Sequence, residues 1–139
     1  MPEPGKTIRT PRVEASLYAA KAREFAAEAS VAREATRYDA ALLLSVHAAI
    51  SSGDAVSVAL AGLRSSDPDH FRAVDLLAGV VRDSEELTRR VRQMRALLQK
   101  KNVVEYESRR ASAIEARDAV ERAGRLVDWA EAIVAKARA

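Results

Sequence analysis

The chain has 139 residues, of which 48% are hydrophobic but only 4% are aromatic. This length supports one domain with one modest core. The apolar content is mainly Ala, Leu and Val, which allow helices to pack closely. The absence of cysteine excludes disulfides, thiol nucleophiles and cysteine-bound zinc. A net charge of +3 excludes a strongly polybasic protein.

The amino-terminal segment 1–9 combines prolines, a glycine and charges without an apolar block, so we expect a flexible basic arm and no signal peptide. Residues 10–139 are predicted to form a single helical domain. Ser45 and His47 interrupt the most apolar stretch, 40–50, which is too short to cross a bilayer. These features predict a cytoplasmic protein that has no membrane contact.

Thr10 and Pro11 are typical of a helix start, with the hydroxyl as N-cap and proline in the first turn. They predict a first helix that runs to about Arg37. Charged side chains alternate with apolar ones in the helical period, which indicates an amphipathic helix. Its expected apolar face contains Leu17, Ala20, Phe25, Ala29 and Ala32.

Apolar residues surround most of the second predicted helix, at about 39–63, so this helix should lie in the centre of the fold. Gly62 lies near its end, where a glycine helps a helix to stop. Asp67 and Pro68 then predict the cap and first turn of a third helix, which should end at about Arg82.

The segment 83–86 is the predicted cap of a fourth helix, with acidic residues that favour its amino-terminal dipole. That helix should end at about Lys101, with a turn over 102–108 and a last helix over about 110–136. No useful stretch alternates with a period of two, so we expect no sheet. The sequence therefore predicts an all-α fold, an antiparallel up-and-down bundle of four to five helices.

Basic residues are concentrated between Arg89 and Arg110, where eight of them stand against two acids, Glu105 and Glu107. A phosphate-bearing partner would need such a patch. The alternative interpretation is a solvated helix face, because clustered arginines are common on helices.

Two segments carry a resemblance to a known family. Residues 37–50, Arg-Tyr-Asp-Ala-Ala-Leu-Leu-Leu-Ser-Val-His-Ala-Ala-Ile, resemble the opening helical hairpin of HEPN domains (higher eukaryotes and prokaryotes nucleotide-binding). Residues 97–107 lie where that family carries its signature of an arginine, four to six residues and a histidine. The counterparts here are Lys101, Asn102 and Tyr106. The similarity covers about 15–136 and resembles a divergent, actinobacterial-looking member with a degenerate signature.

The resemblance implies a HEPN-like bundle that forms a homodimer. Many family members resemble metal-independent endoribonucleases, in which the arginine and histidine of two subunits meet at the dimer cleft. The histidine handles the proton of the ribose 2′-hydroxyl and the arginine holds the scissile phosphate. Others resemble non-catalytic proteins that bind nucleotides or pair with a nucleotidyltransferase-like antitoxin.

The chain departs from the ribonuclease signature at both positions. Lys101 can hold a phosphate as a point charge but lacks the planar fork of arginine. Tyr106 has an ordinary pKa of about 10, against about 6.5 for histidine, and is a poor general base at neutral pH. The alternative for Tyr106 is a buried ring with a bonded hydroxyl. We therefore expect a weakened or lost ribonuclease site.

Further candidate residues surround this signature. The expected phosphate contacts are Arg95, Lys100, Arg109 and Arg110. The expected accessory residues are His47, Asp54 and His70, and either histidine could supply the missing base. The alternative for His47, which shares a helix face with Leu43 and Leu44, is a structural side chain in the core.

Three hypotheses follow for the function. The first is an RNA- or nucleotide-binding protein without catalysis, in a toxin–antitoxin or defence system. The second is a structural bundle that has no nucleic-acid role and binds an acidic protein such as an antitoxin. The third is an active endoribonuclease that uses Lys101 and Tyr106 or a borrowed histidine. No phosphate loop and no metal-ligand spacing is present, so we expect neither a cofactor nor a metal.

Overall fold

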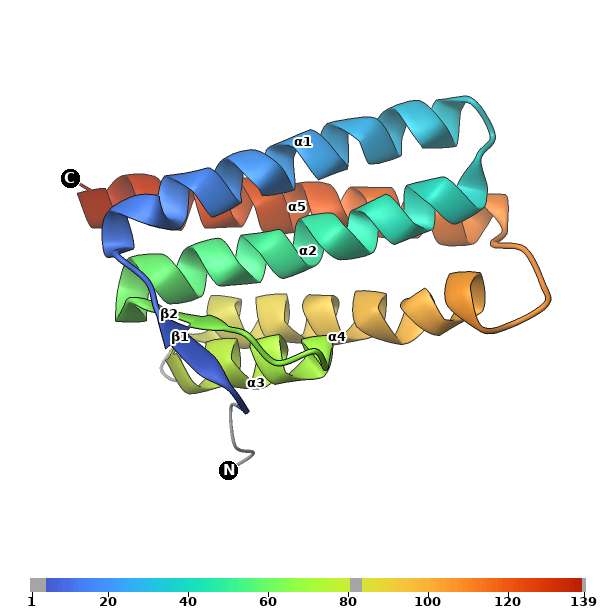
Figure 1. The fold of residues 1–139 in the computed structure, drawn as a ribbon. Helices are drawn as coiled ribbons and strands as arrows, with labels where there is room; N and C mark the ends of the chain where they lie inside the picture. Colours follow the sequence, from blue (N-terminus) through green and yellow to red (C-terminus); the bar gives the residue numbers. More distant parts are fainter. Residues whose placement is uncertain (1–4, 81–83, 139) are drawn as a thin grey trace.

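The computed structural model describes residues 5–80 and 84–138 (Figure 1). In this part of the chain it contains five α-helices, a short 3₁₀-helix and one two-stranded sheet. The elements in chain order are β1 (Thr7–Arg9), η1 (Arg12–Glu14), α1 (Ala15–Glu34), α2 (Tyr38–Ala61), β2 (Leu63–Ser65), α3 (His70–Val80), α4 (Glu85–Glu105) and α5 (Ala113–Arg138). The predicted helical bundle is confirmed.

α2 lies at the centre of the bundle, between α1 and α5 on one side and α3 and α4 on the other (Figure 1). Its buried residues surround the helix, and many of them are alanine, serine or valine. Small side chains let the neighbouring backbones approach closely: Ala48 packs in one buried cluster with Ala22 of α1 and Ala123 of α5. The predicted central position of this helix is confirmed.

The helices run antiparallel to their predecessors, except that α3 runs in the same direction as α2 (Figure 1). The connection through β2 returns along the bundle before α3 begins. Gly62 ends α2 in the left-handed conformation, with φ of 64°, and its N–H donates to the carbonyl of Val58. The predicted stop at this glycine is confirmed, because glycine adopts positive φ without a steric penalty.

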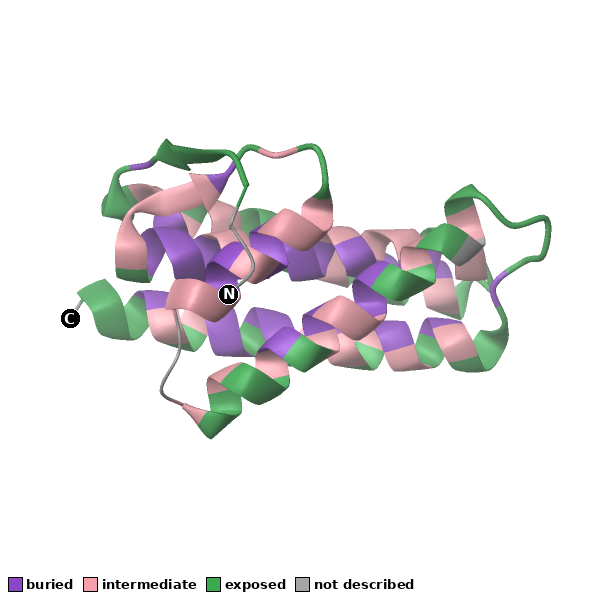
Figure 2. Ribbon diagram, turned by 90° about the horizontal axis from the view of Figure 1, so that it is seen from below, coloured by how far each residue is buried: buried purple, intermediate pink, exposed green. Residues whose placement is uncertain are grey.

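α2 is long and apolar enough to cross a membrane by length and composition alone. However, 67% of its most apolar window is buried inside the protein. Figure 2 shows buried positions where the helices face one another and exposed positions along β1 and the outer loops. Most of this apolar window therefore packs against the other helices, as in a core helix.

The amino-terminal segment corrects two expectations. Residues 7–9, expected to be flexible, form β1 and pair antiparallel with β2, with Ile8 opposite Arg64. The predicted absence of a sheet is therefore wrong, because a three-residue strand is too short to show alternation. Thr10 does not cap the first helix: its hydroxyl donates to the carbonyl of Ile8, and α1 begins at Ala15. Residues 1–4 of the arm lie outside the described part of the chain.

The predicted apolar face of the first helix is partly wrong. Leu17 is 58% exposed and Ala20 is also exposed. Small residues fill the side of α1 that faces the bundle: Ala15, Ala19, Ala22, Ala29 and Ala32. A helix with alanines on one side and larger apolar residues on the other does not reveal from hydrophobicity alone which side is buried.

The later helix boundaries also differ from expectation. Asp67 and Pro68 precede α3, but the carboxylate of Asp69 accepts from the N–H of Phe71 at the start of that helix. The predicted end at Arg82 and the cap residue Asp83 lie outside the described residues. Ser84 caps α4 through the N–H of Leu87.

α4 continues to Glu105, so residues 102–105 of the turn predicted over 102–108 are helical. The last helix begins at Ala113, and Ile114 in its first turn is 63% exposed. Trp129, by contrast, is buried in the main core cluster.

Gly53 of α2 lies at a closely packed point of the core. A Cβ added at this position would lie 2.5 Å from Cε of Met94, a fully buried side chain of α4. We expect Gly53→Val to lower the free energy of unfolding by about 2 kcal/mol through overpacking. Urea denaturation measures this loss. The double variant with Met94→Ala should recover part of it, and equal loss in both variants would contradict a contact between these residues.

Candidate functional site

One side of the otherwise buried helix α2 is only partly covered. The residues on this side recur at a spacing of three or four, so they form a line along the helix. We call this line the α2 strip, and it consists of Leu43, Leu44, His47, Ser51 and Asp54. The sequence predicted that His47 shares a helix face with Leu43 and Leu44, and both leucines are half-buried.

His47 brings three helices together. The centroid of its ring lies 5.9 Å from that of Phe25 on α1 and 6.5 Å from that of His70 on α3. The two imidazoles meet almost at right angles, with 81° between their planes. His70 is the first residue of α3, and this position depends on the chain returning through β2. The two histidines of the chain are therefore neighbours, which their separation in the sequence does not reveal.

Lys101 of α4 adds a positive charge beside this pair. Its ammonium lies 3.4 Å from the carboxylate of Glu105 one turn later, and its side chain is 22% exposed. Burial lowers the pKa of His70, and the charges of Lys101 and His47 lower it further. Asp69 and Glu105 act in the opposite direction but more weakly. This lowered pKa favours the uncharged form of His70, whose ring nitrogen can accept a proton.

Asp54 lies two helical turns beyond His47 on the α2 strip. Burial raises the pKa of its carboxyl group to about 7, although Arg64 and Lys21 favour the charged form. Among the described residues, this carboxylate forms no hydrogen bond and no ion pair. The two cations lie instead near Tyr18: the ammonium of Lys21 is 5.4 Å and the guanidinium carbon of Arg64 is 5.7 Å from the ring centroid.

The other two residues of the predicted signature are less enclosed than Lys101. Asn102 is exposed on α4, and Tyr106 is 77% exposed at the carboxyl end of that helix. The predicted buried ring at Tyr106 is wrong. Tyr106 follows Lys101 by five positions at the end of α4, which places the two about 140° apart around the helix axis. Within one chain, their side chains do not share a face.

The four residues predicted to contact phosphate all have carboxylate partners. Arg95 lies 3.1 Å from Asp75, Lys100 lies 3.3 Å from Glu115, and Arg109 also pairs with Glu115 at 2.8 Å. Arg110 pairs with Asp39 of α2. These pairs neutralise much of the basic segment 89–110 and attach it to α2, α3 and α5.

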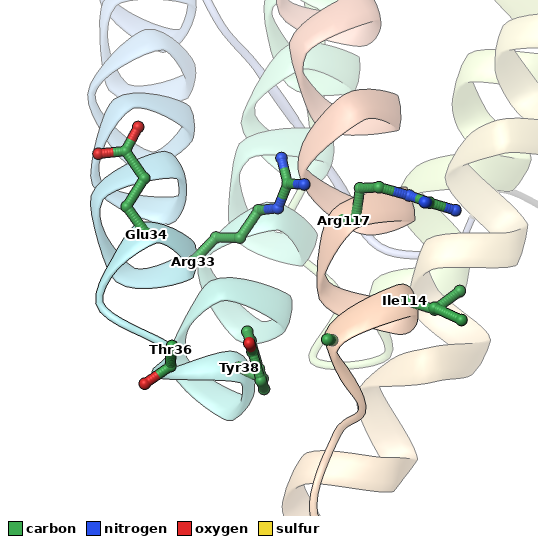
Figure 3. Close-up of a pocket in the computed structure, with 7 residues that line it drawn as sticks. Arg33, Glu34, Thr36, Tyr38, Ile114 and Arg117 are labelled. Carbon is green, nitrogen blue, oxygen red and sulfur yellow. The ribbon is translucent and has the colours of Figure 1, made fainter.

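A hollow of about 540 Å³ lies at one end of the bundle, away from the predicted site residues. The side chains that line it come from the end of α1, the start of α2 and the start of α5: Arg33, Glu34, Thr36, Tyr38, Ala113, Ile114 and Arg117. In Figure 3, Arg33 of α1 reaches toward α5, whereas Arg117 and Ile114 of α5 point away from Arg33. The polar groups do not converge on one point, so we place the candidate site on the α2 strip.

Within residues 5–80 and 84–138, no group of three or more His, Cys, Asp or Glu side chains is placed to hold a metal ion. No family model matches the chain, and no curated protein or solved structure matches it either. The resemblance to HEPN domains therefore rests on the sequence motifs quoted above.

The unpaired carboxyl group of Asp54 generates a prediction about stability. Its pKa is about 7 in the folded protein, against about 3.9 in an unfolded chain. Its contribution to stability is therefore greatest below about pH 4, falls as the pH rises toward 7 and stays constant above that. We expect Asp54→Asn to raise the free energy of unfolding at pH 8 by roughly 2 kcal/mol.

Urea denaturation of both proteins between pH 4 and pH 8 measures this effect. The advantage of Asp54→Asn should shrink as the pH falls and vanish near pH 4. A difference that does not depend on pH would show that the carboxyl group is not held in its neutral form.

Proposed function

We propose that the protein binds the phosphate groups of RNA or of a nucleotide where His47, His70 and Lys101 come together. The observation that carries this proposal is the meeting of the two imidazoles, 6.5 Å apart, beside the charge of Lys101. Imidazole N–H groups and an ammonium are all donors to phosphate oxygens. Three different helices supply them, so the folded state fixes their spacing.

Charge on the neighbouring surface supports the same proposal. The charges of Lys21 and Arg64 act on Asp54, farther along the α2 strip, and both cations lie near the ring of Tyr18. Glu105 is the carboxylate partner of Lys101 and competes with an incoming phosphate. Electrostatic binding of this kind weakens as the salt concentration rises.

The wider proposal follows the sequence motifs. We propose a HEPN-like homodimer in the bacterial cytoplasm that belongs to a toxin–antitoxin or defence system, with a nucleotidyltransferase-like antitoxin as a partner. The motif at 37–50 and the degenerate signature at Lys101, Asn102 and Tyr106 support this proposal, as does the all-helical architecture. Arg95, Lys100, Arg109 and Arg110 contact phosphate in this proposal by exchanging their present carboxylate partners.

Lys101→Ala tests the phosphate site directly. We expect the dissociation constant for a short single-stranded RNA at low salt to rise about tenfold, because one charge-assisted contact is lost. The slope of log affinity against log salt should fall in magnitude by about one. Fluorescence anisotropy at several salt concentrations measures both quantities. Arg125→Ala removes an exposed arginine of α5 and is the matched control.

Equal weakening by Lys101→Ala and Arg125→Ala would show that only the total charge matters. No binding of RNA by the unchanged protein at low salt would rule out the proposal altogether.

The histidine pair also favours a second candidate, metal-independent cleavage of RNA. Uncharged His70 takes the proton from a ribose 2′-hydroxyl, and the 2′-oxygen attacks the adjacent phosphorus. The imidazole of His47 gives a proton to the departing 5′-oxygen. The new bond is 2′-O–P and the broken bond is P–O5′, so the products are a 2′,3′-cyclic phosphate and a 5′-hydroxyl. Lys101 stabilises the negative charge on the phosphate oxygens.

His70→Ala should lower the cleavage rate by about 10²- to 10⁴-fold, the usual contribution of an acid–base group. Single-turnover assays of a labelled RNA, with detection of the cyclic phosphate and a chelator present, measure this loss. Tyr106→Phe is the comparison: it should leave the rate unchanged if the histidines act. Loss in Tyr106→Phe but not in His70→Ala would instead favour the signature residue.

A further inference from the structure

A mainly apolar hollow of about 440 Å³ lies at the end of the bundle where α1 begins and where α2 and α5 end (Figure 1). This is the opposite end from the hollow of Figure 3. Most of its lining consists of valine, leucine and alanine side chains, of which Val13, Leu60 and Val134 are the largest. The charged side chains in the described lining are two arginines, Arg12 and Arg138.

The apolar side chains around this hollow are unusually open to solvent. Val13 is 72% exposed and Leu60 is 38% exposed. Leu17 follows Val13 by four positions, which places it near the same face of α1, and it is also exposed. Exposed apolar surface that gathers in one place marks a binding surface. A hollow of about 300 to 1,000 Å³, with a mostly apolar lining and a few polar groups, is the usual form of a small-ligand site.

The two arginines at the rim have no carboxylate partner among the described residues. Both side chains are exposed, so a ligand can reach their guanidinium groups. Arg12 packs beside Gly62 at the end of α2, where a Cβ added to the glycine would lie 3.8 Å from its Nε. Arg12 also lines a neighbouring hollow of about 620 Å³ together with Arg9. The guanidinium of Arg12 is therefore held at the edge of the apolar hollow.

An apolar hollow with guanidinium groups at its rim fits an amphipathic anion. A guanidinium donates two parallel hydrogen bonds to a carboxylate, and a hydrocarbon chain gains free energy by leaving water. We infer that this end of the bundle binds a medium-chain fatty acid. Its hydrocarbon chain packs against Val13, Leu60 and Val134, and its carboxylate is bound by Arg12 and Arg138.

Other occupants fit this hollow less well. A helix of a partner protein needs a groove that extends over several helical turns, whereas this hollow is confined to the last turns of α2 and α5. A symmetric contact with a second copy of the chain places the same surface on both subunits. Such a contact would bring the arginines of both copies together, and like charges repel.

The arginines also have an alternative role. α2 and α5 both end beside the hollow, and cations stabilise the partial negative charge at the carboxyl end of a helix. That role needs neither the hollow nor the exposure of Val13 and Leu60. It therefore predicts no preference for a carboxylate with a hydrocarbon chain.

Isothermal titration at pH 8, where a carboxylic acid is ionised, tests the inference. Decanoate should bind in a one-to-one ratio, at concentrations below those at which it forms micelles. Each CH₂ group added between hexanoate and decanoate should tighten binding about fourfold, the effect of burying one such group. Decanol has the same hydrocarbon chain without the charge and should bind about tenfold more weakly.

Matched variants locate the bound ligand. Arg12→Ala should weaken decanoate about tenfold and leave decanol unchanged, whereas Arg125→Ala, which removes an exposed arginine elsewhere on α5, should change neither. Val13→Asp places a carboxylate at the hollow and should weaken decanoate by more than about tenfold through like-charge repulsion. Val31→Asp is its control, because Val31 is 57% exposed at the other end of α1. Lys101→Ala should leave decanoate binding unchanged, so this test is independent of the phosphate site.

Equal affinity for decanoate and decanol would overturn the inference and leave the arginines with their role at the helix ends. Equal weakening by Val13→Asp and Val31→Asp would also overturn it, because the ligand would then bind elsewhere. No binding of decanoate, together with a dimer that Val13→Asp dissociates in analytical ultracentrifugation, would assign the hollow to a contact between copies instead. Thermal unfolding of each variant confirms that it is folded.

Discussion

The close packing of small residues around α2 determines the arrangement of the other elements. Ala48 is fully buried against Ala22 of α1 and Ala123 of α5, so these three helices form the tightest part of the bundle. That packing occupies one half of the circumference of α2. The other half is left to α3 and α4, and α3 has only 11 residues. His47 contacts both Phe25 of α1 and His70 of α3, so the partly covered α2 strip lies where α2 meets these two helices.

The helices themselves could be predicted from the sequence because each depends on local signals. The apolar residues on all sides of α2 and the glycine at its end were sufficient to predict that helix. The buried side of α1 could not be predicted, because alanines and larger apolar residues occupy opposite sides of it. Ala19 is buried and Leu17 exposed, contrary to their ranking by hydrophobicity. The side of α1 that is buried depends on how closely the neighbouring helices approach it. The sequence of α1 alone does not determine that distance.

The sheet shows a second limit of local signals. β1 and β2 have three residues each and are separated by the whole length of α1 and α2. Neither has a hydrophobic pattern of its own, so their pairing depends on α1 and α2, which bring the two segments together. The same pairing fixes Arg64, which the sequence did not single out. Its place near Tyr18 and Asp54 follows from the register of β2 and has no signal in the sequence.

The candidate site combines predicted residues in an unpredicted way. His47, Asp54, His70 and Lys101 were all recognised by their chemistry, but as accessories to a signature that ends at Tyr106. In the folded chain His70 lies beside His47, whereas Tyr106 is exposed at the end of α4.

An ionisable side chain on the most apolar helix of the chain lowers stability unless it is paired. The structure gives Asp54 no hydrogen-bond partner in the described residues and raises its pKa to about 7. Alanine at this position would pack without that cost. A cost of this kind is typical of residues that contact a ligand, because polar groups held ready for a ligand are not satisfied within the protein. The location of this unfavourable group, on the same line of α2 as His47, is therefore the strongest physical reason to place the function there.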